Sequence, residues 1–126
     1  MKSIRPFLMF KGGASEVIDT YASWFTDFEV ISKQLIPQTE LIALAEICIH
    51  GQKILLNDTQ QQHAFDFTPS FSFFIECESE QEVHALAEKM KDGGQALMPL
   101  GQYGFSTLFG WYQDRFGVSW QINFNE

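Results

Sequence analysis

Residues 110–124 read GWYQDRFGVSWQINF, and this stretch decides the fold. Two apolar runs flank residues 114–117, whose Asp and Gly are typical of a tight turn. In the second run, alternate residues point to opposite faces of a strand. One face is apolar (Val118, Trp120, Ile122, Phe124) and the other is polar (Ser119, Gln121, Asn123). The stretch therefore predicts a β-hairpin that ends in a two-faced strand.

A similar hairpin is predicted in the first half of the chain. Residues 41–49 and 53–58 are apolar runs on either side of His50 and Gly51. Gly51, Ile54 and Leu56 precede Gly117, Trp120 and Ile122 by 66 residues. The two hairpins therefore look like copies of one unit.

Two amphipathic helices extend this internal similarity. Apolar residues at helical spacing occur in two sets related by an offset of 65: Ile18, Tyr21, Ala22 and Phe25, then Val83, Leu86, Ala87 and Met90. Ser79 and Glu82 match a capping box, and Gly93-Gly94 ends the second helix. Before the helices, apolar strands are expected at residues 4–10 and 71–77, where an offset of 64 pairs Phe7 with Phe71.

Further strands are expected at residues 28–36, 95–100 and 105–113, which gives the order strand, helix and three strands twice. We interpret this as a duplication that forms one α+β domain over residues 1–126. Its parts are a first βαβββ module (1–58), a connecting loop (59–69) and a second βαβββ module (70–126). Together the modules are expected to form a curled, cup-shaped mixed sheet.

The composition narrows the function. The chain has 8 basic and 16 acidic residues, a net charge of −8, which disfavours nucleic acid and anionic membranes as partners. It has no apolar run long enough to span a bilayer, and its first residues do not resemble a signal peptide. Cys48 and Cys77 stand apart in apolar surroundings and are expected to be free thiols. These features predict a cytoplasmic protein that acts on a small molecule.

Residues 6–25 (PFLMFKGGASEVIDTYASWF) and residues 110–124 resemble the N- and C-terminal signatures of PhnB-like proteins. These proteins form a branch of the vicinal-oxygen-chelate (glyoxalase/bleomycin-resistance/dioxygenase) superfamily, and the resemblance covers nearly the whole chain. It implies two half-cups around a cavity, a divalent metal held by two histidines and two glutamates, and frequent pairing into homodimers. Some relatives are named demethylubiquinone methyltransferases. We do not expect that activity, because neither glycine pair fits a G-x-G-x-x-G methyl-donor motif.

The four ligand positions implied by the resemblance fall on Pro6, Leu55, Ser70 and Gln121. None is a histidine or a carboxylate, so we expect the family's metal site to be absent and predict no cofactor. An improvised site made by Asp58 and His63 with a loop carboxylate such as Asp66 is the alternative. All three histidines are expected to face solvent: His50 in a hairpin turn, His63 in the connecting loop and His84 on the polar side of the second helix.

Six residues are candidates for lining a ligand cavity: Ser70, Ser72, Trp111, Ser119, Gln121 and Asn123. The alternative for the polar face of the last strand is plain exposure to water. The loop at 101–104, GQYG, could form a rim or lid beside Tyr103, Trp111 and Tyr112, because its glycines permit backbone motion. Asp114 is expected to cap its own turn.

Three functions remain open at this level. The first is binding of an unknown small molecule without the family metal, and the second is a lyase, isomerase or dioxygenase-type enzyme with an atypical ligand set. The third is a purely structural role as a homodimer. No catalytic triad, Cys-His pair or phosphate loop is recognisable, so no catalytic residue is assigned.

Overall fold

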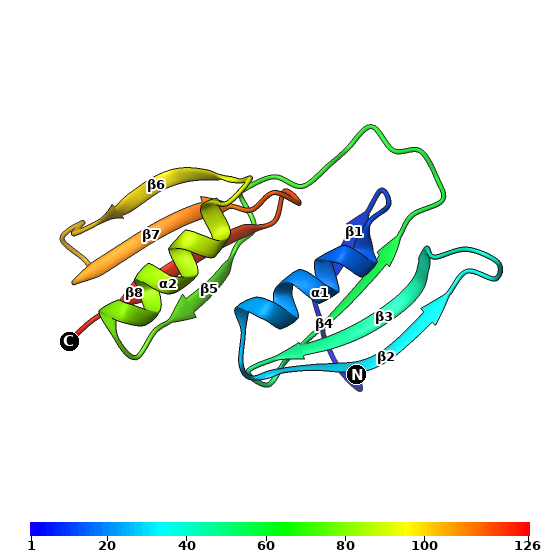
Figure 1. Ribbon diagram of the computed structural model, residues 1–126, viewed down its shortest axis with the longest axis horizontal. Coiled ribbons are helices and arrows are strands. Elements are labelled where there is room, and N and C mark those ends of the chain that lie inside the picture. The colour runs from blue at the N-terminus through cyan, green and yellow to red at the C-terminus, as the bar shows by residue number, and fades with distance from the viewer. The chain divides into compact units, whose positions relative to one another are not determined.

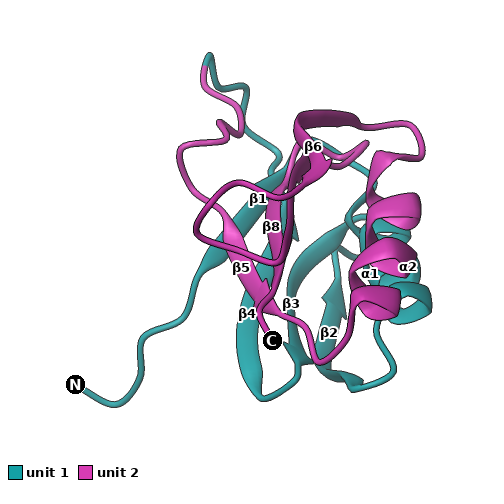
Figure 2. Ribbon diagram, turned by 90° about the vertical axis from the view of Figure 1, so that its left-hand side faces the viewer, with its two compact units in different colours: residues 1–64 teal, residues 65–126 magenta.

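The computed structural model describes all residues of the chain, 1–126, and divides it into two compact units, Met1–Ala64 and Phe65–Glu126. Figure 2 shows them in teal and magenta. Each unit is a four-stranded mixed sheet with one helix packed on it (Figure 1), and neither sheet is closed. The duplicated order of strand, helix and three strands is confirmed. The fold is the expected glyoxalase/bleomycin-resistance type.

Unit 1 consists of β1 (Phe7–Phe10), α1 (Ala14–Trp24), β2 (Phe28–Leu35), β3 (Ile42–Ile49) and β4 (Gln52–Asp58). Its sheet has the order β1-β4-β3-β2, in which only β1 and β4 are parallel. The α1 residues Val17 and Tyr21 and the strand residues Ile47, Ile54 and Leu56 are almost fully buried. These side chains form the core between helix and sheet.

Unit 2 consists of β5 (Phe73–Glu76), α2 (Glu80–Lys91), β6 (Gln95–Gly101), β7 (Leu108–Gln113) and β8 (Ser119–Phe124). Its order, β5-β8-β7-β6, repeats that of unit 1, with β5 and β8 parallel. The helix α2 packs against β7 and β8. Val83 and Met90 of α2, together with Trp120 and Ile122 of β8, are buried in the core.

The predicted equivalence of the hairpins β3–β4 and β7–β8 is confirmed, but the predicted offset between the first strands of the two units is not. Gly51 and Gly117 both have positive φ (83° and 94°), as the turns of equivalent hairpins require. The prediction that Phe7 corresponds to Phe71 is wrong, because Phe7 pairs with Leu55 and its counterpart Phe74 pairs with Gln121. The registers of β1 with β4 and of β5 with β8 make the true offset there 67 instead of 64.

The apolar stripe of the first helix is also shifted. Ala22 is exposed, and Phe25 lies beyond the helix in an extended conformation (φ −115°). The buried stripe of α1 lies about one residue earlier than predicted. It consists of Ala14, Val17, Ile18, Tyr21 and Trp24. The stripe of α2, in contrast, is buried as predicted.

The predicted capping box begins α2 with one difference. The Oγ of Ser79 accepts a hydrogen bond from the Glu82 N–H at 3.1 Å, as expected. The Glu82 carboxylate reaches the N–H of Glu78, at 2.8 Å, instead of that of Ser79. Both bonds satisfy backbone donors at or just before the helix start, so the sequence motif has its expected effect.

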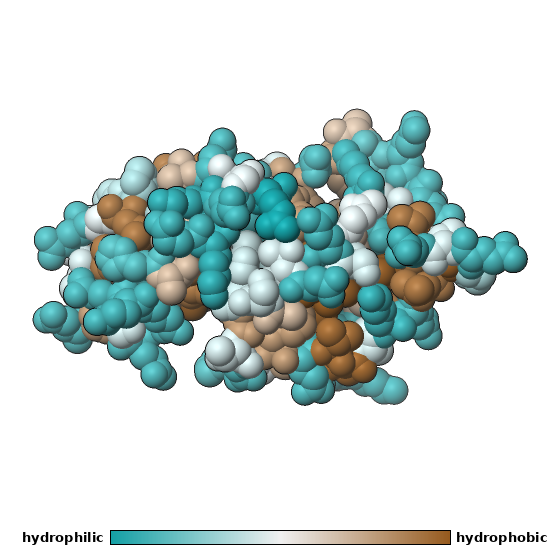
Figure 3. Space-filling view, viewed as in Figure 1, coloured by the Kyte–Doolittle hydropathy of each residue, from teal (hydrophilic) through white to brown (hydrophobic).

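Several other predictions concern single side chains. Cys48 and Cys77 are free thiols, although only Cys77 is fully buried. His50 and His84 are exposed as predicted, whereas His63 is partly buried and lies 3.4 Å from the Oγ1 of Thr59. Neither α1 nor α2 is long and apolar enough to cross a bilayer. Hydrophilic residues dominate the surface seen in Figure 3, with apolar side chains among them.

Candidate functional site

The polar face of the last strand lies on the side of the unit 2 sheet that α2 does not cover. Trp120 and Ile122 are buried against α2, so Ser119, Gln121 and Asn123 point the other way. Their cross-strand neighbours on β7 are Gln113, Trp111 and Phe109. We call this side, with Ser72 and the β5 residues Phe74 and Glu76, the helix-free face of unit 2.

Three of the predicted cavity residues form one hydrogen-bonded chain on this face. The indole Nε1 of Trp111 donates to the Oγ of Ser119 at 2.8 Å. That oxygen also shares a hydrogen bond of 2.6 Å with the Oγ of Ser72. Ser119 is only 2% exposed, so it does not face water as the alternative supposed. The chain holds the half-buried Trp111 ring in one orientation.

Asn123 is held by a second network further along the strand. Its Nδ2 donates to the carboxylate of Glu76 at 3.1 Å, and its Oδ1 accepts from the hydroxyl of Ser106. The side chain is 3% exposed and both ends of its amide are bonded, so Asn123 also does not face water. It has no free polar atom to offer a ligand.

Gln121 lies between these two networks and is different. It is half-buried, and it pairs with Trp111 on one side and with Phe74 on the other. Its side-chain amide makes no hydrogen bond in the structure. A donor and an acceptor are therefore available between two aromatic residues.

Ser70 does not belong to this group. It is exposed in the segment before β5, where its Oγ shares a hydrogen bond of 2.6 Å with the Oγ1 of Thr68. The structure thus brings together Ser72, Trp111, Ser119 and Gln121, places Asn123 at the end of the same strand, and leaves Ser70 apart.

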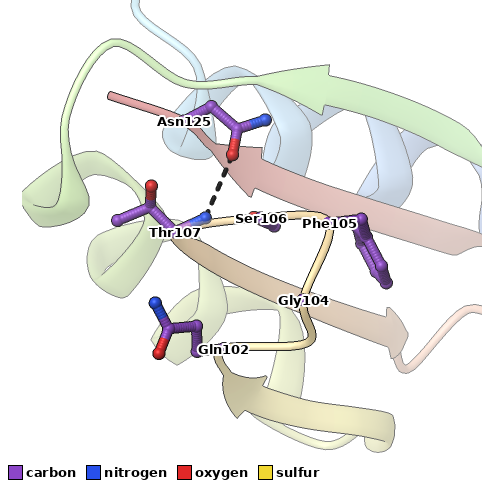
Figure 4. Close-up of a pocket in the computed structure, with 6 residues that line it drawn as sticks. All are labelled: Gln102, Gly104, Phe105, Ser106, Thr107 and Asn125. Atoms are coloured by element: carbon purple, nitrogen blue, oxygen red, sulfur yellow. Dashed lines mark hydrogen bonds between the residues drawn. The ribbon is translucent and has the colours of Figure 1, made fainter.

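An aromatic cluster continues the helix-free face toward the loop between β6 and β7. Phe109 contacts Phe74, Tyr103 and Phe105 at ring-centroid distances of 6.4, 5.9 and 5.1 Å. The loop also forms an open pocket of about 420 Å³ (Figure 4), lined by Gln102, Gly104, Phe105, Ser106, Thr107 and Asn125. The loop at 101–104, predicted as a rim or lid, supplies two of these lining residues. Tyr112 of the same prediction is buried away from it.

The metal positions implied by the family pattern carry an unsuitable set of side chains. The carbonyl of Pro6 accepts the N–H of Leu55 at 3.0 Å, so these two positions do meet at the start of β1. In unit 2 the register makes Phe73, and not Ser70, the counterpart of Pro6. Proline, leucine and phenylalanine side chains offer no ligand atom, and Gln121 offers a neutral amide. This set does not fit a divalent cation.

The carboxylates of the improvised site, Asp58 and Asp66, already accept backbone hydrogen bonds. Both carboxylate oxygens of Asp58 accept backbone N–H groups, from Ala14 and from Ile42, each at 2.9 Å. Asp66 accepts the N–H of its neighbour Phe67 at 2.8 Å. Within each unit, no three His, Cys, Asp or Glu side chains converge in a way that could hold a metal ion. Asp58 thus has a structural role that its sequence position did not reveal.

Two further ionisable groups near the site are also structural. Asp114 caps its turn as predicted, because its Oδ1 accepts the N–H groups of Phe116 and Val118. Burial, and to a lesser extent the neighbouring Glu82 carboxylate, raise the pKa of the Cys77 thiol to about 12. A thiol in this state is a poor nucleophile at neutral pH.

Sequence reasoning missed the corresponding face of unit 1. There the Arg5 guanidinium donates to the Glu46 carboxylate at 2.7 Å, beside the exposed Phe7 and Met9. The side-chain oxygen of Asn57 is buried on this face without a partner. The signal was available, because Asn57 precedes Asn123 by the same 66 residues that relate the two hairpins.

Comparisons with known proteins agree with this architecture. The family model described as 3-demethylubiquinone-9 3-methyltransferase matches residues 2–123. A PhnB protein from Bacillus cereus, named for the same methyltransferase, is 36% identical, with a TM-score of 0.92 over 98% of this chain and 99% of its own. No curated protein sequence matches.

More distant solved structures share the fold. The protein PA1353 from Pseudomonas aeruginosa is 24% identical, with a TM-score of 0.82 over 99% of this chain and 98% of its own. The fosfomycin resistance protein FosX from Listeria monocytogenes is 12% identical, with a TM-score of 0.68 over 100% of this chain and 94% of its own. The chain belongs to the family described as 3-demethylubiquinone-9 3-methyltransferase, which is the PhnB-like branch of the vicinal-oxygen-chelate superfamily.

Proposed function

We propose that the protein binds a small, flat, largely apolar molecule on the helix-free face of unit 2, without the metal ion of its superfamily. The observation that carries this proposal is the arrangement around Gln121. Its unbonded amide lies between Phe74 and Trp111, and the hydrogen-bonded pair of Ser72 and Ser119 fixes the ring of Trp111. Binding sites of small molecules typically combine such apolar walls with a few oriented polar groups.

The hydrogen-bonded chain matters because it reduces the cost of binding. A tryptophan that is already held in place loses little conformational freedom when a ring stacks on it. Phe74 is exposed, so it offers apolar area that a ligand would remove from water. Gln121 would then select ligands that carry a carbonyl or hydroxyl group at the matching position.

A thermal-shift screen with aromatic and quinone-like compounds tests this proposal. A compound that binds the folded state raises the melting temperature, by an amount that grows with its concentration. The Trp111→Leu variant should lose this response. Phe71→Leu is the matched control, because Phe71 is an exposed aromatic residue that contacts Phe73 and not this face. Equal losses in the two variants, or no response to any compound, would contradict the proposal.

Catalysis with an atypical metal site is the second candidate, supported by the superfamily to which the chain belongs. Metal analysis of untagged protein separates the two functions. Stoichiometric zinc, nickel, manganese or iron that disappears in Gln121→Ala or His63→Ala would favour the enzyme. Metal below a tenth of the protein concentration favours binding without metal.

We do not extend the methyltransferase name of the family to this chain. The turn that opens α1 contains Gly12 and Gly13, and it is the part of the chain that most resembles a donor-binding loop. The buried carboxylate of Asp58 already bonds the first N–H of that helix. A second anionic group, such as the carboxylate of a methyl donor, would be repelled there.

We also propose a homodimer in the cytoplasm. Pairing is common in the superfamily, and two free thiols suit a reducing compartment. Light scattering coupled to size-exclusion chromatography measures the mass directly, against 14.5 kDa for one chain.

A further inference from the structure

The strand β2 forms an open edge of the unit 1 sheet. In the order β1-β4-β3-β2 it lies at the end and pairs only with β3. All of its residues are exposed except the half-buried Phe28. Three of the exposed residues are large and apolar: Val30, Ile31 and Leu35. An edge strand of this kind presents unpaired backbone N–H and C=O groups, which another strand can bond.

The equivalent edge strand of unit 2, β6, is protected by its own residues. Pro99 has no N–H to donate, and its carbonyl accepts the hydroxyl of Tyr103 at 2.5 Å. The strand β2 contains no proline. Its one lysine, Lys33, donates to the Oγ of Ser15 in α1 at 3.1 Å, so the charge lies over the helix and does not protect the edge. The two units therefore treat the same edge differently.

The pairing of the neighbouring strands shows which residues of β2 turn their backbone groups to the open edge. A two-residue turn joins β3 to β4, so Ile49 and every second residue before it bond to β4. The β2 residues opposite these cannot also bond to β3, and so they face outward. Leu35 faces outward too, because the next residue, Ile36, donates across the strand pair to Leu41 at 2.8 Å. The outward-facing residues are Phe28, Val30, Lys33 and Leu35.

This outward-facing set is symmetric about the middle of β2. Two residues separate Val30 from Lys33, where regular alternation would leave one, because the strand has a bulge there. An antiparallel copy of β2, related by a twofold axis through the bulge, therefore places each outward-facing residue opposite another. Phe28 meets Leu35 of the second copy and Val30 meets Lys33, which allows about eight N–H···O bonds. A shift of two residues in either direction leaves only half of these pairs.

The side chains are compatible with the same register. The outward-facing pairs bring apolar side chains against each other or against the aliphatic stem of Lys33. On the opposite face of the strand, Glu29 meets Gln34 of the second copy, so the carboxylate lies beside an amide donor and not beside another carboxylate. An interface between two identical surfaces requires this kind of self-complementarity.

We propose that β2 pairs with β2 of a second copy of the chain, so that the two four-stranded sheets of unit 1 become continuous across a twofold axis. This inference rests on the homodimer proposed above and names the surface that forms it. The pairing satisfies the open backbone groups of β2 and removes exposed apolar side chains from water.

Val30→Pro is the first test, because it removes an outward-facing N–H that β3 does not use. Light scattering coupled to size-exclusion chromatography should give twice the 14.5 kDa of one chain for the wild-type protein, and 14.5 kDa for the variant. Val30→Thr is the matched control and should remain a dimer, because it keeps the N–H and the branched shape. A dimer in a folded Val30→Pro would mean that another surface joins the copies, and would overturn this inference alone. A monomeric wild-type protein would overturn the homodimer as well.

Amide hydrogen exchange of the wild-type protein is the second test, and it does not require a variant to fold. Ala96 is the control, because it faces outward on the edge of β6 and is exposed. After correction for the intrinsic rates, we expect the N–H groups of Val30 and Lys33 to exchange at least about tenfold more slowly than that of Ala96. Equal rates in a dimer of confirmed mass would overturn the pairing of β2 and leave the homodimer standing.

Discussion

The indole Nε1 of Trp120 donates a hydrogen bond of 2.9 Å to the Oδ2 of Asp114 in the buried interior of unit 2. The other oxygen of the same carboxylate accepts the backbone N–H groups of Phe116 and Val118. One side chain thus fixes both the turn between β7 and β8 and the largest side chain of the core. Its loss leaves several buried donors without an acceptor.

Asp114→Ala should therefore lower the free energy of unfolding by about 3 kcal/mol or more. Urea denaturation followed by tryptophan fluorescence measures the change. Asp27→Ala is the control, because Asp27 forms an exposed ion pair with His50 and should cost no more than about 0.5 kcal/mol. Similar losses in the two variants would show that the buried carboxylate has no special role.

Asp58 should behave as a structural residue and not as a metal ligand. Asp58→Asn keeps one acceptor oxygen but turns an NH₂ group toward a backbone N–H, so we expect a loss of about 2 kcal/mol in the free energy of unfolding. Asp19→Asn, on the exposed side of α1, should change little. The measurement is paired denaturation and metal analysis. A lower metal content in Asp58→Asn, with unchanged stability, would support the improvised metal site instead.

The elements of the fold could be predicted because their signals are local. Apolar periodicity, the glycine pairs and the capping box each involve residues close together in the sequence. All ten elements appear in the expected order, with ends displaced by up to three residues. Register was harder. The error at Phe71 arose because both Phe71 and Phe74 fit an apolar strand, and only the pairing of Phe74 with Gln121 decides between them.

The candidate site was predictable only in part, for a similar reason. Alternation on the last strand correctly separates Gln121 from Trp120, since that depends on neighbours alone. The bond between Ser72 and Ser119 joins residues 47 positions apart, and no local pattern indicates it. The role of Asp58 depends likewise on partners distant in the sequence, the backbone N–H groups of Ala14 and Ile42, and so it was missed.

The two thiols should differ in reactivity. Burial and the nearby Glu82 raise the pKa of Cys77 to about 12, so its thiol stays protonated at any pH below about 10. We expect iodoacetamide at pH 8 to modify Cys48, which is only half-buried, and to spare Cys77 in the folded protein. Mass spectrometry of the digested protein gives the extent at each site. Equal modification would contradict the assigned burial.

The raised pKa of Cys77 also predicts how stability changes with pH. The unfolded thiol loses its proton near pH 9, whereas the folded one keeps it until about pH 12. Within this interval the unfolded state binds fewer protons, so the stability that is present below pH 9 is lost as the pH rises. Cys77→Ala should remove this part of the pH dependence while leaving the rest.

Gly94 should be intolerant of any side chain, although it follows a helix end where glycine is common. A Cβ there would lie 2.6 Å from the carbonyl oxygen of Met90 and would also meet the carbonyl oxygen of Gln113. Both are backbone atoms of packed elements, so they cannot move aside as a flexible side chain could. We expect Gly94→Ala to destabilise the protein by about 3 kcal/mol. Gly104→Ala has open space around its Cβ and pays only for a positive φ of 78°, about 1–2 kcal/mol. Urea denaturation of both variants tests the difference, and equal costs would show that Gly94 is not packed this closely against α2 and β7.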